Sequence, residues 1–119
     1  MINELVNSQE QISAVFAALA DLSRRRILLS LSSGDETSVS ALSKPFRISA
    51  PAISRHLRVL ENARLIERRR EGRAHLIRAR AAGMKAAQEW MANCVAGWQF
   101  SFDALDTLLK NETRKESKT

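Results

Sequence analysis

Apolar positions recur with helical periodicity over most of the chain. The first stripe advances in steps of three and four residues through Ile12, Val15, Phe16 and Leu19, which predicts a helix near residues 9–20. Ser8 and Gln11 precede the stripe with capping-box spacing. Residues 1–8 lie before this signal and predict a flexible N-terminal arm.

A second helix is predicted after Asp21, a suitable N-cap, with Ile27, Leu28 and Leu31 as its apolar stripe. Gly34 and Asp35 end that helix. Residues 36–38 are long enough only for a linking strand. A short third helix, from about Val39 to Lys44, stops at Pro45, which a helix interior does not tolerate.

The stretch SAPAISRHLRVLENA predicts a fourth helix, near residues 49–63, with Ser49 as N-cap and Pro51 in its first turn. Its apolar stripe lies at i, i+4 and i+7, on Ile53, Leu57 and Leu60. The opposite side carries only small, hydroxyl or cationic residues, at Ala50, Ser54, Arg55 and Arg58. Such a face can enter the major groove of DNA, because nothing bulky blocks approach to the base edges.

The run LIERRREGRAHLIRAR then predicts a two-stranded hairpin that turns at Glu71-Gly72 and carries four arginines near its tip. Apolar positions at helical spacing follow from Ala81 to about Leu109 and predict a last helix. Residues 111–119 are polar and predict a disordered tail. The expected fold is mainly α with a small β-hairpin, in the order α-α-α-α-β-β-α, which is a winged helix-turn-helix over residues 9–110.

The distribution of charge along the chain suggests a binding partner. The 119-residue chain has a formal net charge of +6. Residues 44–80 hold eleven Lys or Arg and three Glu, a balance of +8, whereas the rest of the chain has a balance of −2. A basic run is often only a solvated face, but this one coincides with the groove-facing helix and the hairpin. That coincidence favours double-stranded DNA as the partner.

Two other classes of protein fit the sequence less well. An enzyme is disfavoured because the chain has no Gly-rich phosphate loop, no nucleophile beside a recognisable base and no metal cluster, so no catalytic residue is predicted. A winged helix used only for protein–protein contact has no need of the +8 segment. The polar N-terminus and the lack of a long apolar run exclude a secretory signal and a membrane span, so we expect a cytoplasmic protein.

Three segments resemble the ArsR family of winged-helix repressors: ALADLSRRRILLSL, ISAPAISRHLRVLENARLIERRREGR and WQFSFDALDTLL. They are similar to that family's second helix, its recognition helix with wing, and the C-terminal helix of members that lack a metal site. The resemblance implies a transcriptional repressor that blocks a promoter. It departs at Leu22, where the family usually has Pro, and at Arg64, where it usually has Gly. A left-handed residue other than glycine costs about 1 kcal/mol, so we expect the local turn after the fourth helix to differ.

Metal sensing, known in this family, is not expected here. The segment SVSALSK, which matches the family's metal-binding third helix, has no Cys or His, and residues 81–119 have no His. Soft metals need thiolate or imidazole ligands. The chain therefore resembles a metal-independent member, without a metal or other cofactor.

The predicted DNA contacts lie on the fourth helix and the hairpin. Ser49, Ala50, Ser54 and Arg55 are expected nearest the bases. Phosphate contacts are expected from Arg58 and His56, although His56 equally fits a helix-packing role. The hairpin residues Arg68, Arg70 and Arg73 are expected to reach the flanking backbone or minor groove, and His75 fits a phosphate or solvent contact.

The first and last helices are expected to form a homodimer on an inverted-repeat operator, because the last helix has apolar residues on more than one face. The expected interface residues are Val15, Met91, Cys94, Trp98, Phe102 and Leu105. Cys94 fits a small buried hydrophobe better than a redox sensor. The aromatic residues fit core or interface better than a ligand pocket, although a small-molecule or redox effector stays open.

Overall fold

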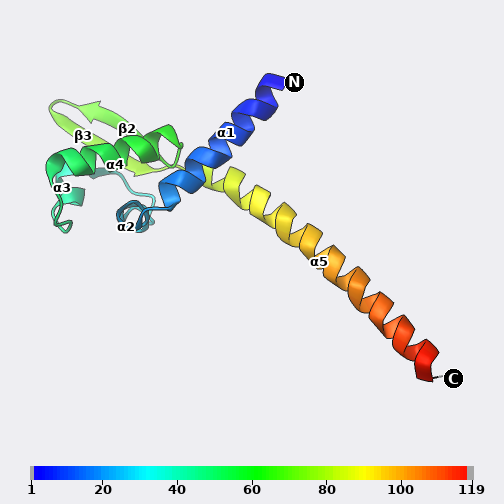
Figure 1. Cartoon of the computed structure of the whole chain (residues 1–119). Helices are drawn as coiled ribbons and strands as arrows, with labels where there is room; N and C mark the ends of the chain where they lie inside the picture. The colour runs from blue at the N-terminus through cyan, green and yellow to red at the C-terminus, as the bar shows by residue number, and fades with distance from the viewer. Residues whose placement is uncertain (1, 118–119) are drawn as a thin grey trace. The chain divides into compact units, whose positions relative to one another are not determined.

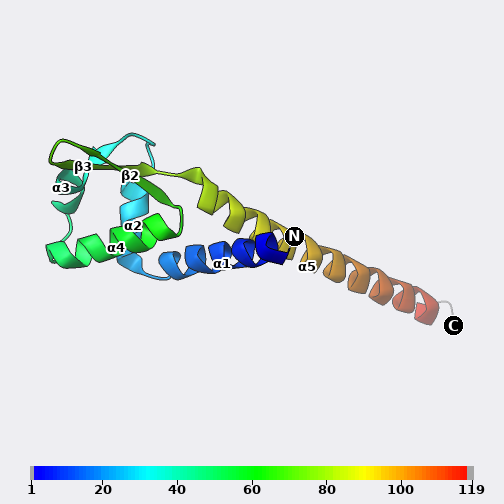
Figure 2. The same ribbon diagram turned by 90° about the horizontal axis from the view of Figure 1, so that it is seen from above.

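The computed structural model describes residues 2–117, and the side chains of residues 9–113. The chain divides into two compact units, residues 1–87 and residues 88–119, and each is described here by itself. Figures 1 and 2 show a mostly helical chain with one small antiparallel sheet. The fold is the winged helix-turn-helix that the sequence predicted, and the short linking strand pairs with the hairpin.

Helix α1 (Ile2–Leu19) begins seven residues earlier than expected. Residues 2–8, predicted as a loose arm, are helical, and Met1 lies outside the described residues. The sequence contains no glycine or proline before residue 34, so nothing in the backbone chemistry forces the helix to start at Ser8. Val15 and Ala18 on this helix are fully buried.

Helix α2 (Leu22–Ser30) starts as predicted at the N-cap Asp21, whose carboxylate accepts a hydrogen bond of 3.0 Å from the Arg24 backbone N–H. Strand β1 (Thr37–Ser38) follows and leads directly into α3 (Val39–Ser43). Ser38 caps α3 by accepting a hydrogen bond from the Ala41 N–H. Side-chain caps therefore set the start of both helices.

Helix α4 (Ala50–Asn62) is positioned by its apolar stripe. Ile53, Leu57 and Leu60 are buried as predicted and join the core of the first unit. This helix packs against α1, α2 and the first strand of the hairpin. Because α1, α2 and β2 cover one side of α4, the opposite side faces outwards.

The chain leaves α4 through a left-handed residue. Arg64 has φ 58°, and the N–H groups of Arg64 and Leu65 donate to the carbonyls of Glu61 and Leu60, both at 3.0 Å. This pair of bonds is the Schellman motif that usually carries glycine at the left-handed position. The expectation of a different turn was therefore wrong: Arg64 adopts the glycine conformation, and the two hydrogen bonds offset its cost.

The hairpin consists of β2 (Ile66–Glu71) and β3 (Ala74–Ala79), paired antiparallel from Ile66 with Ala79 to Glu71 with Ala74. Gly72 and Arg73 form the turn, one residue later than predicted, and Gly72 has the positive φ of 60° that a two-residue hairpin turn needs. Strand β1 pairs with β3, so the sheet has three strands in the order β1-β3-β2.

Helix α5 (Ala81–Ser117) is longer than predicted. Residues 111–117, expected to be disordered, are helical, and residues 118–119 lie outside the described residues. No glycine or proline follows Gly97, so polarity alone did not end the helix. Its first turns belong to the first unit, where Ala87 is buried and the Gly83 N–H donates to the Arg64 carbonyl at 3.2 Å.

The two glycines of α5 predict opposite effects on stability. A Cβ at Gly83 would lie 2.5 Å from the Ala63 carbonyl oxygen and 2.9 Å from that of Arg64. Gly83→Ala should therefore lower the free energy of unfolding by about 1–3 kcal/mol. A Cβ at Gly97 meets nothing within 4 Å, so Gly97→Ala should raise the same quantity by up to about 1 kcal/mol. Urea denaturation at one fixed protein concentration measures both, and equal effects would contradict the close approach at Gly83.

Candidate nucleic-acid interface

The outward face of α4 is free of internal partners. Ser49 caps the helix by accepting a hydrogen bond of 3.3 Å from the Ala52 N–H. Ser54 lies one turn further on and is exposed. Arg55 and Arg58 are also exposed, and within the described part of the chain neither forms a hydrogen bond or ion pair. Two unpaired guanidinium groups on a helix of otherwise small side chains can donate to base edges or phosphates.

His56 lies on a different side of α4. Its Nδ1 is 3.3 Å from Arg24 Nη1 and 3.9 Å from Asp21 Oδ2, and its side chain is only 19% exposed. The Arg24 guanidinium also donates to the carbonyls of Ala17 and Ala18 at the end of α1. His56 therefore links α4 to the α1–α2 junction, which is the packing role that the sequence left open beside a phosphate contact.

The two sides of the hairpin differ in how their arginines are used. Because side chains alternate along a strand, Arg68 and Arg70 share the side that carries buried Ile66, while Arg69 lies on the other. Arg68 Nε lies 3.4 Å from Glu61 Oε2 on α4, within ion-pair distance but without hydrogen-bond geometry. This places the side of Arg68 and Arg70 next to α4.

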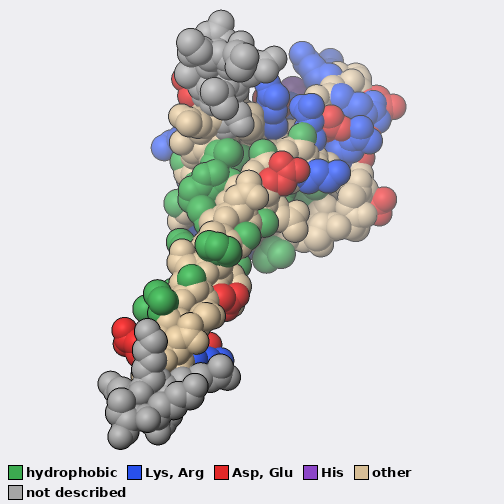
Figure 3. Space-filling view, turned by 90° about the vertical axis from the view of Figure 1, so that its right-hand side faces the viewer, with side chains coloured by type: hydrophobic (Ala, Val, Ile, Leu, Met, Phe, Trp, Pro, Cys, Tyr) green, Lys and Arg blue, Asp and Glu red, His purple; other side chains and the backbone are tan. Residues whose placement is uncertain are grey.

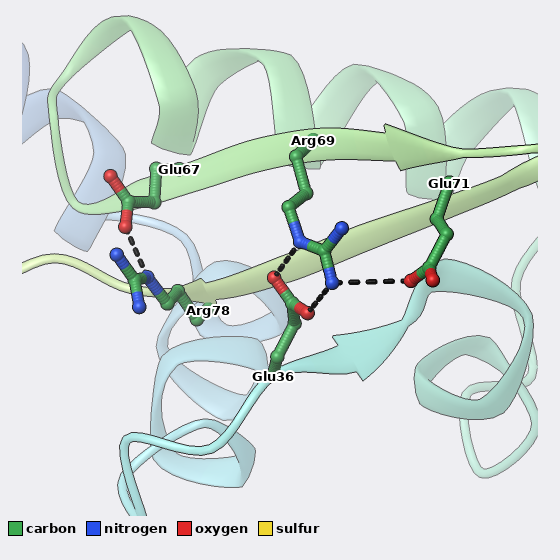
Figure 4. Close-up of polar contacts among 5 residues, drawn as sticks. All are labelled: Glu36, Glu67, Arg69, Glu71 and Arg78. Atoms are coloured by element: carbon green, nitrogen blue, oxygen red, sulfur yellow. Dashed lines mark hydrogen bonds and ion pairs between the residues drawn. The ribbon is translucent and has the colours of Figure 1, made fainter.

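Arg69 is neutralised by carboxylates (Figure 4). Its Nε and Nη2 donate to the two oxygens of Glu36 at 2.7 and 2.6 Å, and Nη2 also donates to Glu71 at 3.2 Å. Arg78 on β3 is paired with Glu67 through a single hydrogen bond from its Nε. The guanidinium of Arg69 lowers the pKa of Glu36 through these hydrogen bonds. Two hairpin cations are thus paired with carboxylates of the same chain.

Arg70 and Arg73, by contrast, are exposed at the hairpin tip and make no hydrogen bond or ion pair with any described residue. Figure 3 shows Lys and Arg side chains gathered on one side of the first unit. The structure thus brings Arg68, Arg70 and the outward face of α4 to one side of the hairpin. Free cations beside a helix with a clear outer face are what binding to a nucleic-acid backbone requires.

Sequence reasoning missed two features of this region. It did not single out Lys44 and Arg47, which are exposed in the turn between α3 and α4, although both lie in the basic segment that it identified. It also missed the Glu36–Arg69 pair, because the two residues are 33 positions apart and meet only through strand register. The sequence carries no local signal for such a contact.

The expected interface residues of the last helix are mostly exposed. Trp98, Phe102 and Leu105 are 63%, 66% and 54% exposed, while Cys94 is only partly accessible. Trp90 and Phe100 are exposed too, so neither belongs to the core of this chain. Val15 differs: it is fully buried in the core of the first unit, and its side chain is not available to a partner.

The described residues were also compared with the requirements of a metal site and of a membrane-spanning helix. Among the described residues, no group of three or more His, Cys, Asp or Glu is placed to hold a metal ion. Within the same part of the chain, no helix has the length and apolarity that a membrane crossing demands.

Comparison with known proteins gives one consistent family. The model of the bacterial regulatory proteins of the arsR family matches residues 21–68. The chain is 35% identical over 81 residues to the transcriptional repressor SdpR of Bacillus subtilis strain 168, which covers 68% of this chain and 89% of SdpR. It is 37% identical over 68 residues to the transcriptional repressor SmtB homolog of Synechocystis, which covers 57% of this chain and 51% of that protein.

Solved structures agree with this result. An ArsR-like transcriptional regulator from Rhodococcus sp. RHA1 matches with a TM-score of 0.73 and 29% identity, over 86% of this chain and 95% of that one. A crystal structure of an ArsR family transcriptional regulator matches with a TM-score of 0.72 and 33% identity, over 76% and 93% of the two chains.

The ion pair at the hairpin predicts a specific titration. Arg69→Ala removes the guanidinium that lowers the pKa of Glu36, so this pKa should rise towards its ordinary value. Because the native pKa is lowered, the stabilisation is fully present above the ordinary pKa of Glu and is lost as pH falls through the lowered one. Carboxyl-carbon NMR shifts measured against pH follow Glu36 directly. Arg70→Ala is the control and should leave the titration unchanged; an unchanged pKa in Arg69→Ala would contradict the pairing.

Proposed function

Because the chain belongs to the ArsR family of bacterial regulatory proteins, and is thus a DNA-binding transcriptional regulator and not an enzyme, we propose that it is a sequence-specific repressor. In this proposal it acts as a homodimer on an inverted-repeat operator. The observation that carries the proposal is the free outward face of α4 beside a hairpin with unpaired arginines. SdpR is named a transcriptional repressor, which supports repression over activation.

Helix α4 reads the sequence in this proposal. Ser49, Ala50, Ser54 and Arg55 approach the base edges, with Arg55 supplying a guanidinium that can grip a guanine in a bidentate way. Arg58 approaches a phosphate. His56, packed against Arg24, reaches the backbone only at the edge of the contact, so its main contribution is to hold α4 against α2. Two observations support these roles. The five residues other than His56 are exposed, and the apolar stripe on the other side of the helix is buried in the core.

The hairpin supplies affinity without sequence information. Arg70 and Arg73 carry unpaired charges at the tip and meet phosphates or the minor groove. Arg68 lies on β2 with Arg70 but is close to Glu61, so its charge is partly offset. Arg69 and Arg78 contribute least, because carboxylates of the same chain already pair with them.

A homodimer is supported by the apolar surface of α5. The exposed positions include Met91, Trp98, Phe102 and Leu105, with Cys94 partly accessible beside them. A solitary helix in water does not hold such a face exposed without a partner. The interface therefore lies on α5 rather than at Val15, which the core already uses. No metal or other cofactor is part of this function, and a small-molecule or redox effector stays open.

Substitutions on α4 and on the hairpin should impair DNA binding in different ways. Arg55→Ala should weaken binding to the operator by about 1–3 kcal/mol and blur the preference at one base position. Arg70→Ala should weaken operator and scrambled duplexes together and lower the salt slope by about one unit. Arg69→Ala is the matched control: it should leave the base preference and the salt slope unchanged, because that arginine pairs with Glu36 and Glu71 and meets no phosphate in this proposal.

The measurement is a titration of each variant against both duplexes at several salt concentrations, after selection of the operator from random duplexes. Unchanged discrimination in Arg55→Ala would show that α4 is not the reading helix. If wild-type protein binds no duplex more tightly than random DNA, the proposed function itself is wrong.

The homodimer predicts a charge-sensitive interface on one side of α5. Trp98→Glu should convert the dimer to a monomer at micromolar concentration, because a carboxylate cannot be buried there without a partner. Phe100→Glu is the control: it lies about 160° away around the helix, and the dimer should persist. Sedimentation equilibrium measures both, and a wild-type monomer at this concentration would rule the homodimer out.

A further inference from the structure

A hollow in the first unit lies between α2 and the turn that joins α3 to α4. Its volume is about 620 Å³, which is in the range of small-molecule sites. One wall consists of three α2 residues at i, i+3 and i+7, a spacing that puts Ser23, Arg26 and Ser30 on one face of the helix. Residues 45–48 form the other wall. No residue of α4 or of the hairpin lines this hollow, so it is separate from the face that we assign to DNA.

The two walls each contribute one arginine, Arg26 from α2 and Arg47 from the turn. Both are exposed, and within the described part of the chain neither forms a hydrogen bond or an ion pair. The lining of the hollow contains no Asp or Glu. Two guanidinium groups without a carboxylate of their own give the hollow a positive potential, and both can donate paired hydrogen bonds to an anionic oxygen.

The rest of the surface around these two cations is apolar. Phe46 is half-buried and packs against the core, and Ile48 is 39% exposed in the same wall. Leu22 and Leu29, which lie about one helical turn on either side of Arg26, are 56% and 72% exposed. An inorganic anion would leave this apolar surface in water. A ligand that also covers it gains hydrophobic free energy, so the hollow favours a molecule with both an anionic group and an apolar body.

We propose that this hollow binds a small organic carboxylate with an apolar body. The carboxylate lies between Arg26 and Arg47 and accepts hydrogen bonds from both guanidinium groups. The Ser23 hydroxyl donates a further one, and the apolar body covers Phe46 and Ile48. A neutral compound of the same shape gains only the apolar contact, because it brings no charge to the two arginines.

The hollow is connected to the DNA-binding helix through the chain itself. Ile48 directly precedes Ser49, which caps α4 by accepting a hydrogen bond from the Ala52 N–H. A bound carboxylate also neutralises Arg47, one of the cations of the basic segment. Because affinity for DNA falls as cations are removed, the acid should weaken DNA binding. By linkage, DNA should weaken binding of the acid by the same factor.

Only this coupling rests on the proposed function, since binding of the acid can be measured without DNA. Titrations of the ¹⁵N-labelled full chain with 2-naphthoate, followed by backbone amide NMR shifts, should give a saturable change at residues 45–48 and at Arg26. The neutral analogue 2-naphthamide and inorganic phosphate should bind about tenfold more weakly. Equal affinities for naphthoate and naphthamide would overturn the proposal, and so would shifts confined to the exposed apolar residues of α5.

Substitutions then locate the site. Arg26→Gln and Arg47→Gln should each weaken naphthoate binding by about tenfold. Arg80→Gln is the matched control: Arg80 is exposed, lies outside the lining of the hollow and loses the same charge, so the affinity for naphthoate should not change. An equal loss in all three variants would show that naphthoate responds only to net charge and would overturn the site.

The last measurement adds the operator duplex. Saturating naphthoate should lower the affinity of the wild-type chain for the operator by about fivefold, and Arg47→Gln should remove most of this effect. If both arginine variants weaken DNA binding but leave naphthoate binding unchanged, the hollow contacts the DNA backbone and the proposal is wrong. Absence of naphthoate binding in a chain that recognises the operator would overturn the site alone. Saturable naphthoate binding in a chain without preference for any duplex would overturn the proposed function and leave the site standing.

Discussion

Burial of Ile53, Leu57 and Leu60 is the interaction on which the rest of the first unit depends. This stripe fixes α4 against α1, α2 and β2, and so decides which of its side chains face outwards. Rotating the helix by one position would bury a charged or hydroxyl residue in the core, at a cost of several kcal/mol. The direction in which Arg55 points is therefore a consequence of hydrophobic packing on the opposite side.

Charge count alone overstates the basic surface. The central segment has a balance of +8 by sequence, but Arg69 and Arg78 are held by Glu36 and Glu67 across the sheet. These pairs are exposed and add little stability by themselves. Because these pairs use Arg69 and Arg78, the unpaired arginines of the hairpin are Arg70 and Arg73 at its tip, and Arg70 lies on the side next to α4.

The sequence predicted those features whose causes are local. The caps at Asp21 and Ser49 and the stripe of α4 follow from residues a few positions apart. The start of α1 and the end of α5 were placed wrongly. The capping-box spacing of Ser8 and Gln11 lies inside α1 and does not start it, and the polar composition of residues 111–117 is compatible with either helix or coil. The turn at Arg64 was misjudged for another reason: two backbone hydrogen bonds and the close approach of Gly83 hold it left-handed. The pair of Glu36 with Arg69 depends on strand register, which no local pattern specifies.

In the proposed function, the apolar surface of α5 and the outward face of α4 serve one energetic requirement. A single bidentate arginine contributes about 1–3 kcal/mol of discrimination, whereas a regulator must separate its operator from other DNA by about 4–10 kcal/mol. One copy of α4 presents too few base-reading side chains to reach that range. The proposed homodimer on an inverted repeat doubles this readout. The same proposed homodimer gives a partner to the large apolar side chains that α5 exposes outside the core of the first unit.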